Sequence, residues 1–233
     1  MPYTKSLARK DFESVIEALK TLSYSASLKK NKIPYDIQQC VYRNAIFQAS
    51  SALEMYVKTI LEDWLHQLHQ HSHPLTMLPK ELVFLAIGKK QKEAFKKYLL
   101  NDSESELVSG LMSLNTLPNY FNDTTLVRDA IRTNEHINDK KYPSHKNMVT
   151  IFKRFGIKDI MKSIQIRGKK DYRKILESFS DIRTEIAHQY PSSALTFTDI
   201  KTQLSSISNL VSMVDTEMYW HVFRTSDINC WKT

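Results

Sequence analysis

An arginine and a histidine, five positions apart on one predicted helix, are the residues of this sequence best suited to chemistry. They are Arg183 and His188, and the helix that carries them ends before Pro191. The planar charge of an arginine can stabilise an anion such as a phosphate, and a histidine can give or take a proton near neutral pH. The two residue types together indicate acid–base chemistry on an anionic substrate.

Helix geometry places the two side chains on different faces. At 100° per residue from Phe179, the centre of the apolar stripe, Arg183 falls at about 40° and His188 at about 180°. Arg183 therefore faces a carboxylate, a phosphate or a polar seam, or it extends along the surface to reach water. His188 is either a proton-transfer group or an ordinary surface histidine. A distorted helix end or a second copy across a two-fold axis would bring the two side chains together.

Glu54 is a possible supporting residue on the long helix predicted for residues 34–70. It lies beside the apolar stripe of that helix, and a buried carboxylate needs a partner. Arg183 is one candidate partner, and Lys58, one turn along the same helix, is the other. Arg43 and Asn44 precede Glu54 on this helix and are placed to line the same cleft.

Positive charge is concentrated in one segment. The chain has a net charge of +8 and a pI of about 9.3, and residues 153–174 alone carry nine basic and two acidic side chains, a net charge of +7. Such a run is either a solvated helix face or a phosphate-binding patch for RNA. The basic residues are Lys153, Arg154, Lys158, Lys162, Arg167, Lys169, Lys170, Arg173 and Lys174.

Four histidines near the end of the first long helix are a second possible site. His66 and His69 can share a helix face, as metal ligands often do, and His71, His73 and Asp63 lie nearby. The segment contains no HExxH pattern and no cysteine. Polar histidines at a fraying helix end are the simpler account, so we predict no metal and no cofactor.

The composition predicts an all-α protein. Hydrophobic residues make up 42% of the 233 residues, but there are only 4 glycines and 7 prolines, too few for the many turns of a sandwich or barrel. Apolar residues recur every three or four positions. Long helices are predicted at 34–70, 169–189 and 198–224, the last capped by Thr198 or Asp199. Shorter helices are predicted at 9–22, 79–100, 103–114, 124–133, 144–155 and 158–165, with Ser144 as an N-cap and Gly156 just past the end of its helix.

We predict one helical domain over residues 1–233. Its core comprises 34–70 and 144–224, and a helical and loop insertion occupies about 75–143. The glycines form no P-loop and no GxGxxG motif. The two widely spaced cysteines, with no signal peptide and no apolar run long enough to span a bilayer, predict a cytoplasmic protein without a membrane partner.

Several segments resemble one known family. The segment 179–189 is similar to the Arg-x4–6-His motif of the HEPN (higher eukaryotes and prokaryotes nucleotide-binding) superfamily. The helical segments 42–57, 147–156 and 199–204 resemble core helices of its ribonuclease-like members, in particular the RiboL-PSP-HEPN type. The resemblance extends in order over about residues 34–215, with a divergent middle.

This resemblance implies an antiparallel helical bundle that forms a homodimer and places two Arg/His pairs in one cleft. Active members are metal-independent RNA endonucleases, some of them toxins or phage-defence effectors with an antitoxin or accessory protein as partner. By analogy His188 assists transfer of the ribose 2′-hydroxyl proton, Arg183 stabilises the transition state, and the product carries a 2′,3′-cyclic phosphate. Thr184 stands where many members have Asn, Asp or His, and it cannot ionise. We favour an endoribonuclease; the alternative is a non-catalytic module that binds RNA or a protein partner.

Overall fold

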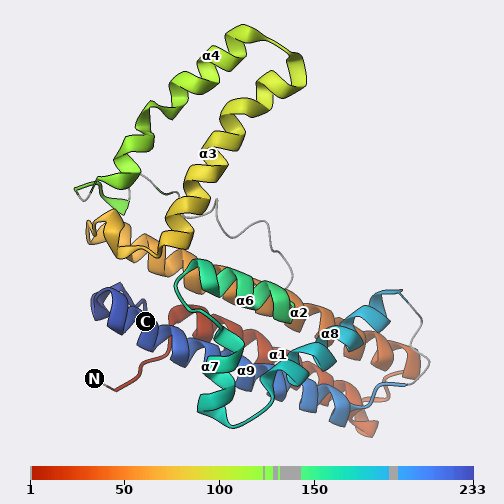
Figure 1. Ribbon diagram of the computed structural model, residues 1–233. Coiled ribbons are helices and arrows are strands. Elements are labelled where there is room, and N and C mark those ends of the chain that lie inside the picture. Colours follow the sequence, from red (N-terminus) through yellow and green to blue (C-terminus); the bar gives the residue numbers. More distant parts are fainter. Residues whose placement is uncertain (1, 123, 128–130, 132–142, 189–193) are drawn as a thin grey trace.

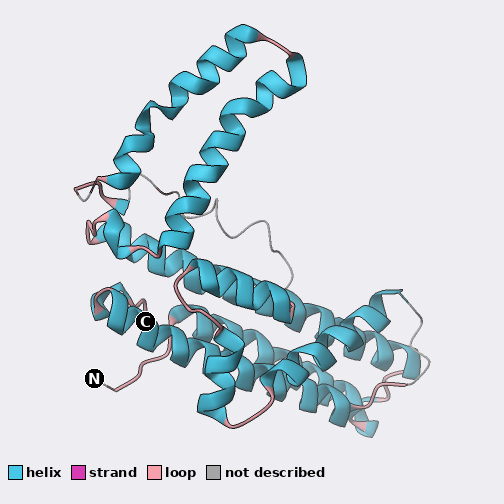
Figure 2. Cartoon of the chain, viewed as in Figure 1, coloured by secondary structure: helices cyan, strands magenta, loops and turns pink. Residues whose placement is uncertain are grey.

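The protein is an all-α structure, as the sequence predicts. The computed structural model describes residues 2–122, 124–127, 131, 143–188 and 194–233. Over these residues the ordered elements are helices, and the described chain forms no β-strand beyond one isolated bridge between Pro74 and Leu126 (Figure 2). The scarcity of glycine and proline agrees with this architecture because long helices need few turns.

Four long helices form the body of the molecule, an antiparallel bundle. They are α1 (Leu7–Ser27), α2 (Tyr35–Gln70), α8 (Tyr172–His188) and α9 (Phe197–Thr225). Helix α1 packs along both α2 and α9, and α8 packs against α2 and α9 (Figure 1). Helix α1 precedes the core predicted at 34–70 and 144–224, and its inward face is buried with that core.

Two short helices lie across the body and lead into α8. Helix α6 (His145–Arg154) begins at Ser144, whose hydroxyl accepts a hydrogen bond from the backbone of Asn147, so this predicted N-cap is confirmed. Gly156 follows the helix end with φ of 90°, a conformation that side-chain-bearing residues rarely adopt. Helix α7 (Ile160–Gly168) is capped by Asp159.

The cap of α9 differs from the prediction. Thr196, rather than Thr198 or Asp199, is the N-cap, and its hydroxyl accepts from the backbone N–H of Asp199. The carboxylate of Asp199 in turn accepts from the backbone and hydroxyl of Thr196, which completes a capping box. The helix therefore begins before Thr198, because Asp199 is needed at the third helical position.

The core is continuous through the body and includes large aromatic side chains. Trp64 is almost fully buried and lies against Phe155 and His221, while its indole N–H donates to Ser226 at 3.2 Å. Fully burying one such apolar side chain contributes about 1.5–3 kcal/mol. Other large side chains that are fully buried include Tyr42, Tyr56, Tyr172, Tyr219, Phe152, Phe179, Ile16, Ile46, Leu53 and Leu61.

One buried carboxylate fastens the N-terminal segment to α9. Asp215 is 0% exposed and accepts hydrogen bonds from the hydroxyls of Tyr3, Ser6 and Tyr56. Burial raises the pKa of Asp215, although hydrogen bonds from Ser6 and Tyr3 act in the opposite direction. Buried polar groups are tolerated where they are hydrogen-bonded, and these bonds hold the entry to α1 in place.

Two antiparallel helices form an arm that projects from the body. The arm consists of α3 (Lys80–Asn101) and α4 (Glu104–Met112), followed by the 3-10 helix η3 (Ser113–Phe121) that leads back (Figure 1). It lies within the insertion predicted at 75–143. Half of the helix predicted at 124–133 falls outside the described residues. The remaining short helices are η1 (Lys29–Asn31), η2 (Leu75–Met77) and η4 (Ile228–Cys230).

None of the described helices has an apolar stretch long enough to cross a lipid bilayer.

Candidate functional site

Helix α8 is buried in its first half and open in its second half. Tyr172, Leu176 and Phe179 are buried in the core, whereas Ile182 and Ile186 on the same stripe are only half-buried. The segment that contains the arginine and the histidine therefore lies where the body covers the helix least. An apolar stripe that one chain leaves partly open is suited to contact with a substrate or with a second chain.

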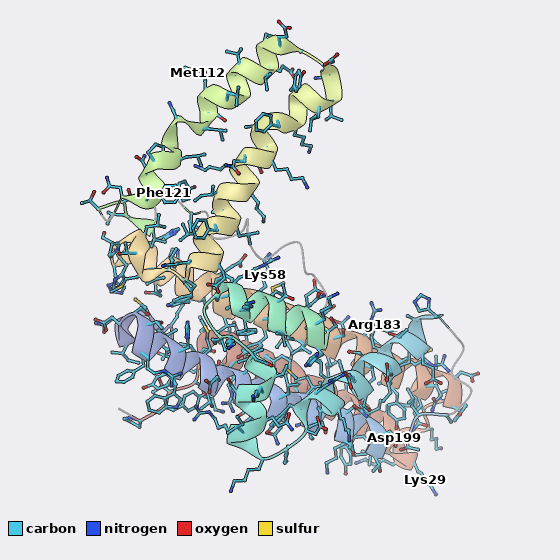
Figure 3. The ribbon with its side chains drawn as sticks, viewed as in Figure 1. Lys29, Lys58, Met112, Phe121, Arg183 and Asp199 are labelled. Atoms are coloured by element: carbon cyan, nitrogen blue, oxygen red, sulfur yellow. The ribbon has the colours of Figure 1, made fainter. Side chains whose placement is uncertain are left out.

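Arg183 is half-buried, as its position in the stripe predicts, and it lies against an aromatic ring of α2. The guanidinium carbon of Arg183 is 5.7 Å from the centre of the Phe47 ring, a cation–π arrangement. Figure 3 shows Arg183 where α8 lies along α2. The ring holds the guanidinium from one side, so the orientation of Arg183 depends on packing between two helices.

The face of α2 that carries Phe47 also carries Arg43 and Glu54, two residues that were predicted to lie near the site. Arg43 lies one turn before Phe47 and Glu54 lies two turns after it, and helical spacing puts all three within about 40° of one direction. Arg43 and Glu54 are half-buried, whereas Asn44 is exposed. The structure thus brings Arg43, Phe47 and Arg183 into one region, with Glu54 about 10 Å further along the α2 axis.

Neither partner considered for Glu54 pairs with it. The ion pairs of the described residues include none between Glu54 and Arg183, and Lys58 instead approaches Glu62 at 3.9 Å. The reason is axial distance, since Arg183 meets α2 two turns away from Glu54. Arg183 therefore does not pair with Glu54 as expected. It packs on the ring of Phe47 instead.

His188 is exposed and is the last residue of α8. Thr184, one turn earlier, is exposed as well, so both lie on the solvent side of the helix while Arg183 faces α2. The helix is regular up to His188, so within one chain the side chains of Arg183 and His188 point about 140° apart around the helix axis, as predicted. The catalytic roles of Arg183, His188, Thr184 and Glu54 stay predictions.

A hollow of about 400 Å³ lies between α8 and the start of α9. On the α8 side it is lined by Ile182, Glu185 and Ile186, a different face from the one that carries Arg183. On the α9 side Asp199 belongs to the capping box, and its hydrogen bonds with Thr196 lower the pKa of its carboxyl. The remaining lining residues are Ala194, Leu195, Thr202 and Gln203.

The nine basic residues of segment 153–174 do not form one uniform surface. Three of them pair with carboxylates: Arg167 with Glu217 at 2.7 Å, Arg173 with Glu177 at 2.8 Å and Lys174 with Asp171 at 3.6 Å. Arg154 is half-buried. The other five lysines are exposed, and no ion pair of the described residues engages them; they are Lys153, Lys158, Lys162, Lys169 and Lys170.

Arg167 has a structural partner as well as a predicted role in RNA binding. Both its Nε and its Nη2 donate to one carboxylate oxygen of the buried Glu217, which links α7 to α9. The basic segment ends at the start of α8, and 16 residues of helix, about 24 Å, separate Tyr172 from His188. RNA binding by this segment remains a prediction.

The histidine cluster is dispersed in the structure. His73 contacts the thiol of Cys230 at 3.3 Å, His66 contacts Gln70 at 3.4 Å, and Asp63 pairs with Lys232. Burial raises the pKa of the Cys230 thiol. Within the part of the chain that the structure describes, no three His, Cys, Asp or Glu side chains are grouped to hold a metal ion.

Sequence reasoning missed Phe47 as the contact of Arg183. The available signal was its position on α2, one turn after Arg43 and on the face adjacent to the buried stripe. A phenylalanine at such a position is normally assigned to the core. Its role as a platform for a charged side chain emerges only when α8 is placed against α2.

An antiparallel all-α bundle with an arginine and a histidine at the open end of one helix is what the resemblance to HEPN proteins leads us to expect. The model of the RiboL-PSP-HEPN family matches residues 10–219, which is most of the chain and includes α1. The protein therefore belongs to the RiboL-PSP-HEPN family of the HEPN superfamily, and this prediction is confirmed. No curated protein and no solved structure was found to match the chain.

Proposed function

We propose that this protein is an RNA endonuclease of HEPN type that works without a metal ion and serves as a toxin or phage-defence effector. Membership of the RiboL-PSP-HEPN family supports an RNA-related function. The observation that carries the proposal is the position of Arg183 and His188 on the least covered half of α8. There Arg183 is oriented by Phe47, and His188 is accessible to a substrate.

In the proposed reaction the ribose 2′-oxygen attacks the neighbouring phosphorus. His188 takes the 2′-hydroxyl proton, the new bond from the 2′-oxygen to phosphorus forms, and the bond from phosphorus to the 5′-oxygen breaks. Arg183 stabilises the charge that develops on the phosphate oxygens. The leaving 5′-oxygen takes up a proton from the second histidine of a two-copy cleft. The products are a 2′,3′-cyclic phosphate and a 5′-hydroxyl.

Two copies are part of this proposal because one chain does not bring Arg183 and His188 together. The half-buried Ile182 and Ile186 supply apolar surface beside the motif for a two-fold contact. We expect sedimentation to detect a dimer at micromolar concentration. Disruption of that dimer by an Ile186→Asp substitution, with loss of cleavage, would support a composite cleft.

The first prediction concerns the histidine itself. His188→Ala should reduce cleavage of single-stranded RNA in EDTA by about 10²–10⁴-fold, because removal of a general acid–base group has this effect. Arg183→Lys should also be severely impaired, since lysine lacks the planar fork of arginine. Cleavage is followed on gels, and the product end is checked for a cyclic phosphate.

A matched control is His71→Ala, which removes an exposed histidine at the far end of α2 and should leave cleavage unchanged. Thermal unfolding should show that His188→Ala keeps the stability of the wild type. Equal cleavage by the wild type and His188→Ala would favour a non-catalytic binding module. Activity that EDTA abolishes and Zn²⁺ restores would contradict a metal-independent mechanism.

The second prediction separates exposed lysines from paired arginines in segment 153–174. Lys158→Ala and Lys162→Ala should each weaken RNA binding and reduce its salt dependence, because both side chains are exposed and no described carboxylate pairs with them. Arg173→Ala should have a smaller effect, because Glu177 already neutralises that side chain. The measurement is RNA affinity at several salt concentrations with His188→Ala as the background. An equal loss for all three substitutions would contradict this ranking.

A further inference from the structure

The arm carries several exposed large apolar side chains. Leu99 and Leu100 near its tip are 77% and 72% exposed, and Met112 on α4 is 67% exposed. Figure 3 shows Met112 pointing away from the body on the outer helix. Monomeric proteins rarely leave large apolar patches uncovered, so this arm indicates a contact surface.

On α3 the open surface follows the spacing of a coiled-coil seam. Phe84, Gly88, Gln91, Phe95 and Tyr98 are separated by four, three, four and three residues. Phe84 and Phe95 are exposed, and a Cβ added to Gly88 would meet no atom within 4 Å, so the seam is open from Gly88 to Phe95. At its two ends Phe84 lies 6.4 Å from the ring of Phe121, and Tyr98 is half-buried. Beside it runs a row of basic side chains, Lys89, Lys92 and Lys96.

On α4 the outward face is apolar and acidic. Val108, Leu111 and Met112 are exposed at spacings of three and four residues, and Glu104 lies one turn before Val108 on the same face. The inner face of α4 is fixed by Gly110, where a Cβ would run into the backbone of Ala94. The two helices of the arm therefore meet at the level of Gly110 and Ala94.

We propose that the arm pairs with the arm of a second copy of this chain, antiparallel, to form a four-helix bundle. The open face of α3 is apolar and basic, and the open face of α4 is apolar and acidic, so each fits the other across a two-fold axis. The same arm supplies both halves of the contact, which is the condition for a self-complementary interface.

Charge positions select the antiparallel arrangement. Measured from the level of Gly110 and Ala94, Glu104 lies six residues, about 9 Å, towards the tip, and the exposed Lys92 lies two residues, about 3 Å, towards the body. Two arms that run antiparallel about this level bring Glu104 of one copy within about one helical turn of Lys92 of the other. Parallel arms would instead place the acidic tips, with Asp102 and Glu104, beside each other.

The position of the arm keeps this contact apart from the Arg183–His188 segment. Arg183 meets α2 at Phe47, whereas the arm follows the end of α2 at Gln70, about 35 Å further along the helix axis. Arm pairing therefore goes beyond the proposed cleavage and would join separate cleft-forming dimers. The acidic tip disfavours insertion into an anionic lipid surface, so a second copy is the occupant that we infer.

The test is sedimentation velocity of the full chain over a range of concentrations. Phe95→Asp and Met112→Asp should each raise the concentration needed for half-maximal association through the arm by at least tenfold. The matched control is Ile166→Asp, at a residue of the body that is 70% exposed, which should leave association unchanged. Circular dichroism should show that all three variants keep their helix content.

A charge exchange tests the orientation. Lys92→Glu and Glu104→Lys should each weaken association at low salt, and the double variant should recover part of it, because the attraction between positions 92 and 104 across the two-fold axis is then restored with opposite sign. A double variant no better than the single variants would overturn the antiparallel pairing. Wild-type and arm variants that sediment alike would overturn arm pairing altogether.

Two further outcomes separate this inference from the other proposals. A wild-type chain that does not self-associate but binds vesicles of anionic lipid through Phe95 and Met112 would overturn it in favour of a membrane contact. RNA cleavage should be unchanged in Met112→Asp, so a failure of the His188 prediction leaves the arm result intact. Loss of arm pairing likewise leaves the His188 result intact.

Discussion

The body and the arm are both built from amphipathic helices, but they bury their apolar side chains to different extents. In the body, Trp64 and Phe179 are enclosed by other helices of the same chain. In the arm, the base of α3, with Leu82 and Ala86, and Tyr120 of η3 reach the core, and Leu99 further out is left in solvent. The difference follows from geometry, because two helices alone bury one side of each other and leave the rest exposed.

This contrast shows which region carries stability and which is available for recognition. The body has a continuous core, a buried hydrogen-bonded Asp215 and an N-terminal segment fastened to α9. In the arm, α4 approaches α3 closely at Gly110, and the outer surface is largely solvated. Elements with few buried contacts open more readily than the core does. We therefore expect the arm to respond to partners and the body to determine whether the chain folds.

The largest change in the free energy of unfolding is expected from a cavity in the core of the body. Trp64→Ala should lower the free energy of unfolding by about 3–5 kcal/mol, since it removes a large buried ring that contacts Phe155 and His221. Leu99→Ala in the arm should change it by less than about 0.5 kcal/mol, because that side chain is exposed. Urea denaturation measures both. Comparable losses would show that the arm is part of the cooperative core.

A smaller effect is expected from two glycines within the arm. Gly110→Ala should destabilise the contact of α4 with α3 by about 1–3 kcal/mol, because the new methyl group meets the backbone of Ala94. Gly88→Ala has open space and should instead stabilise α3 by about 0.5–1 kcal/mol. Hydrogen exchange of arm amides should therefore change in opposite directions, with body amides unaffected. Changes of the same sign would contradict this account of the helix contact.

The smallest effect is a pH dependence that belongs to the body. Burial lowers the pKa of His221 below its ordinary value of 6.5, outweighing the hydrogen bond with the Phe155 backbone that raises it. The unfolded chain then binds a proton at higher pH than the folded chain does. This contribution to stability is full above about pH 6.5 and is lost as the pH falls from there towards the folded pKa of His221.

The measurement compares the unfolding free energy of the wild type with that of His221→Gln from pH 8 to pH 5. The wild type should lose stability relative to the variant as the pH falls through this range. A constant difference between the two proteins would show that the titration of His221 does not couple to folding.

Much of the fold was predictable because its signals are local. The period of apolar residues located α2, α8 and α9 within a few residues, and the caps at Ser144 and Gly156 follow from the side chains and backbone of a few neighbouring positions. The cap of α9 was predicted two or three residues too late, at Thr198 or Asp199. Thr198 and Asp199 are suitable caps by residue type, but the reciprocal hydrogen bonds of the capping box select Thr196.

The candidate site was predictable only in part. Helix periodicity alone placed Arg183 towards the body and His188 towards solvent, as the structure has them. It did not identify the residue that Arg183 contacts on α2. Whether that residue is Glu54 or Phe47 depends on the axial position of α8 along α2. Nor did it separate the exposed Lys162 from the paired Arg167, whose partner Glu217 is 50 residues away in the sequence.

The helical class and the faces of α8 follow from the order of the residues, because both depend on spacings within a few helical turns, and the family follows from the resemblance of several segments along the chain. Helix packing was needed to reveal that Phe47 supports Arg183, that Asp215 anchors the N-terminal segment, and that α3 and α4 stand away from the body as an arm. These features depend on the axial offsets and angles at which helices pack. Packing of whole surfaces sets those offsets and angles, and no short stretch of sequence encodes them.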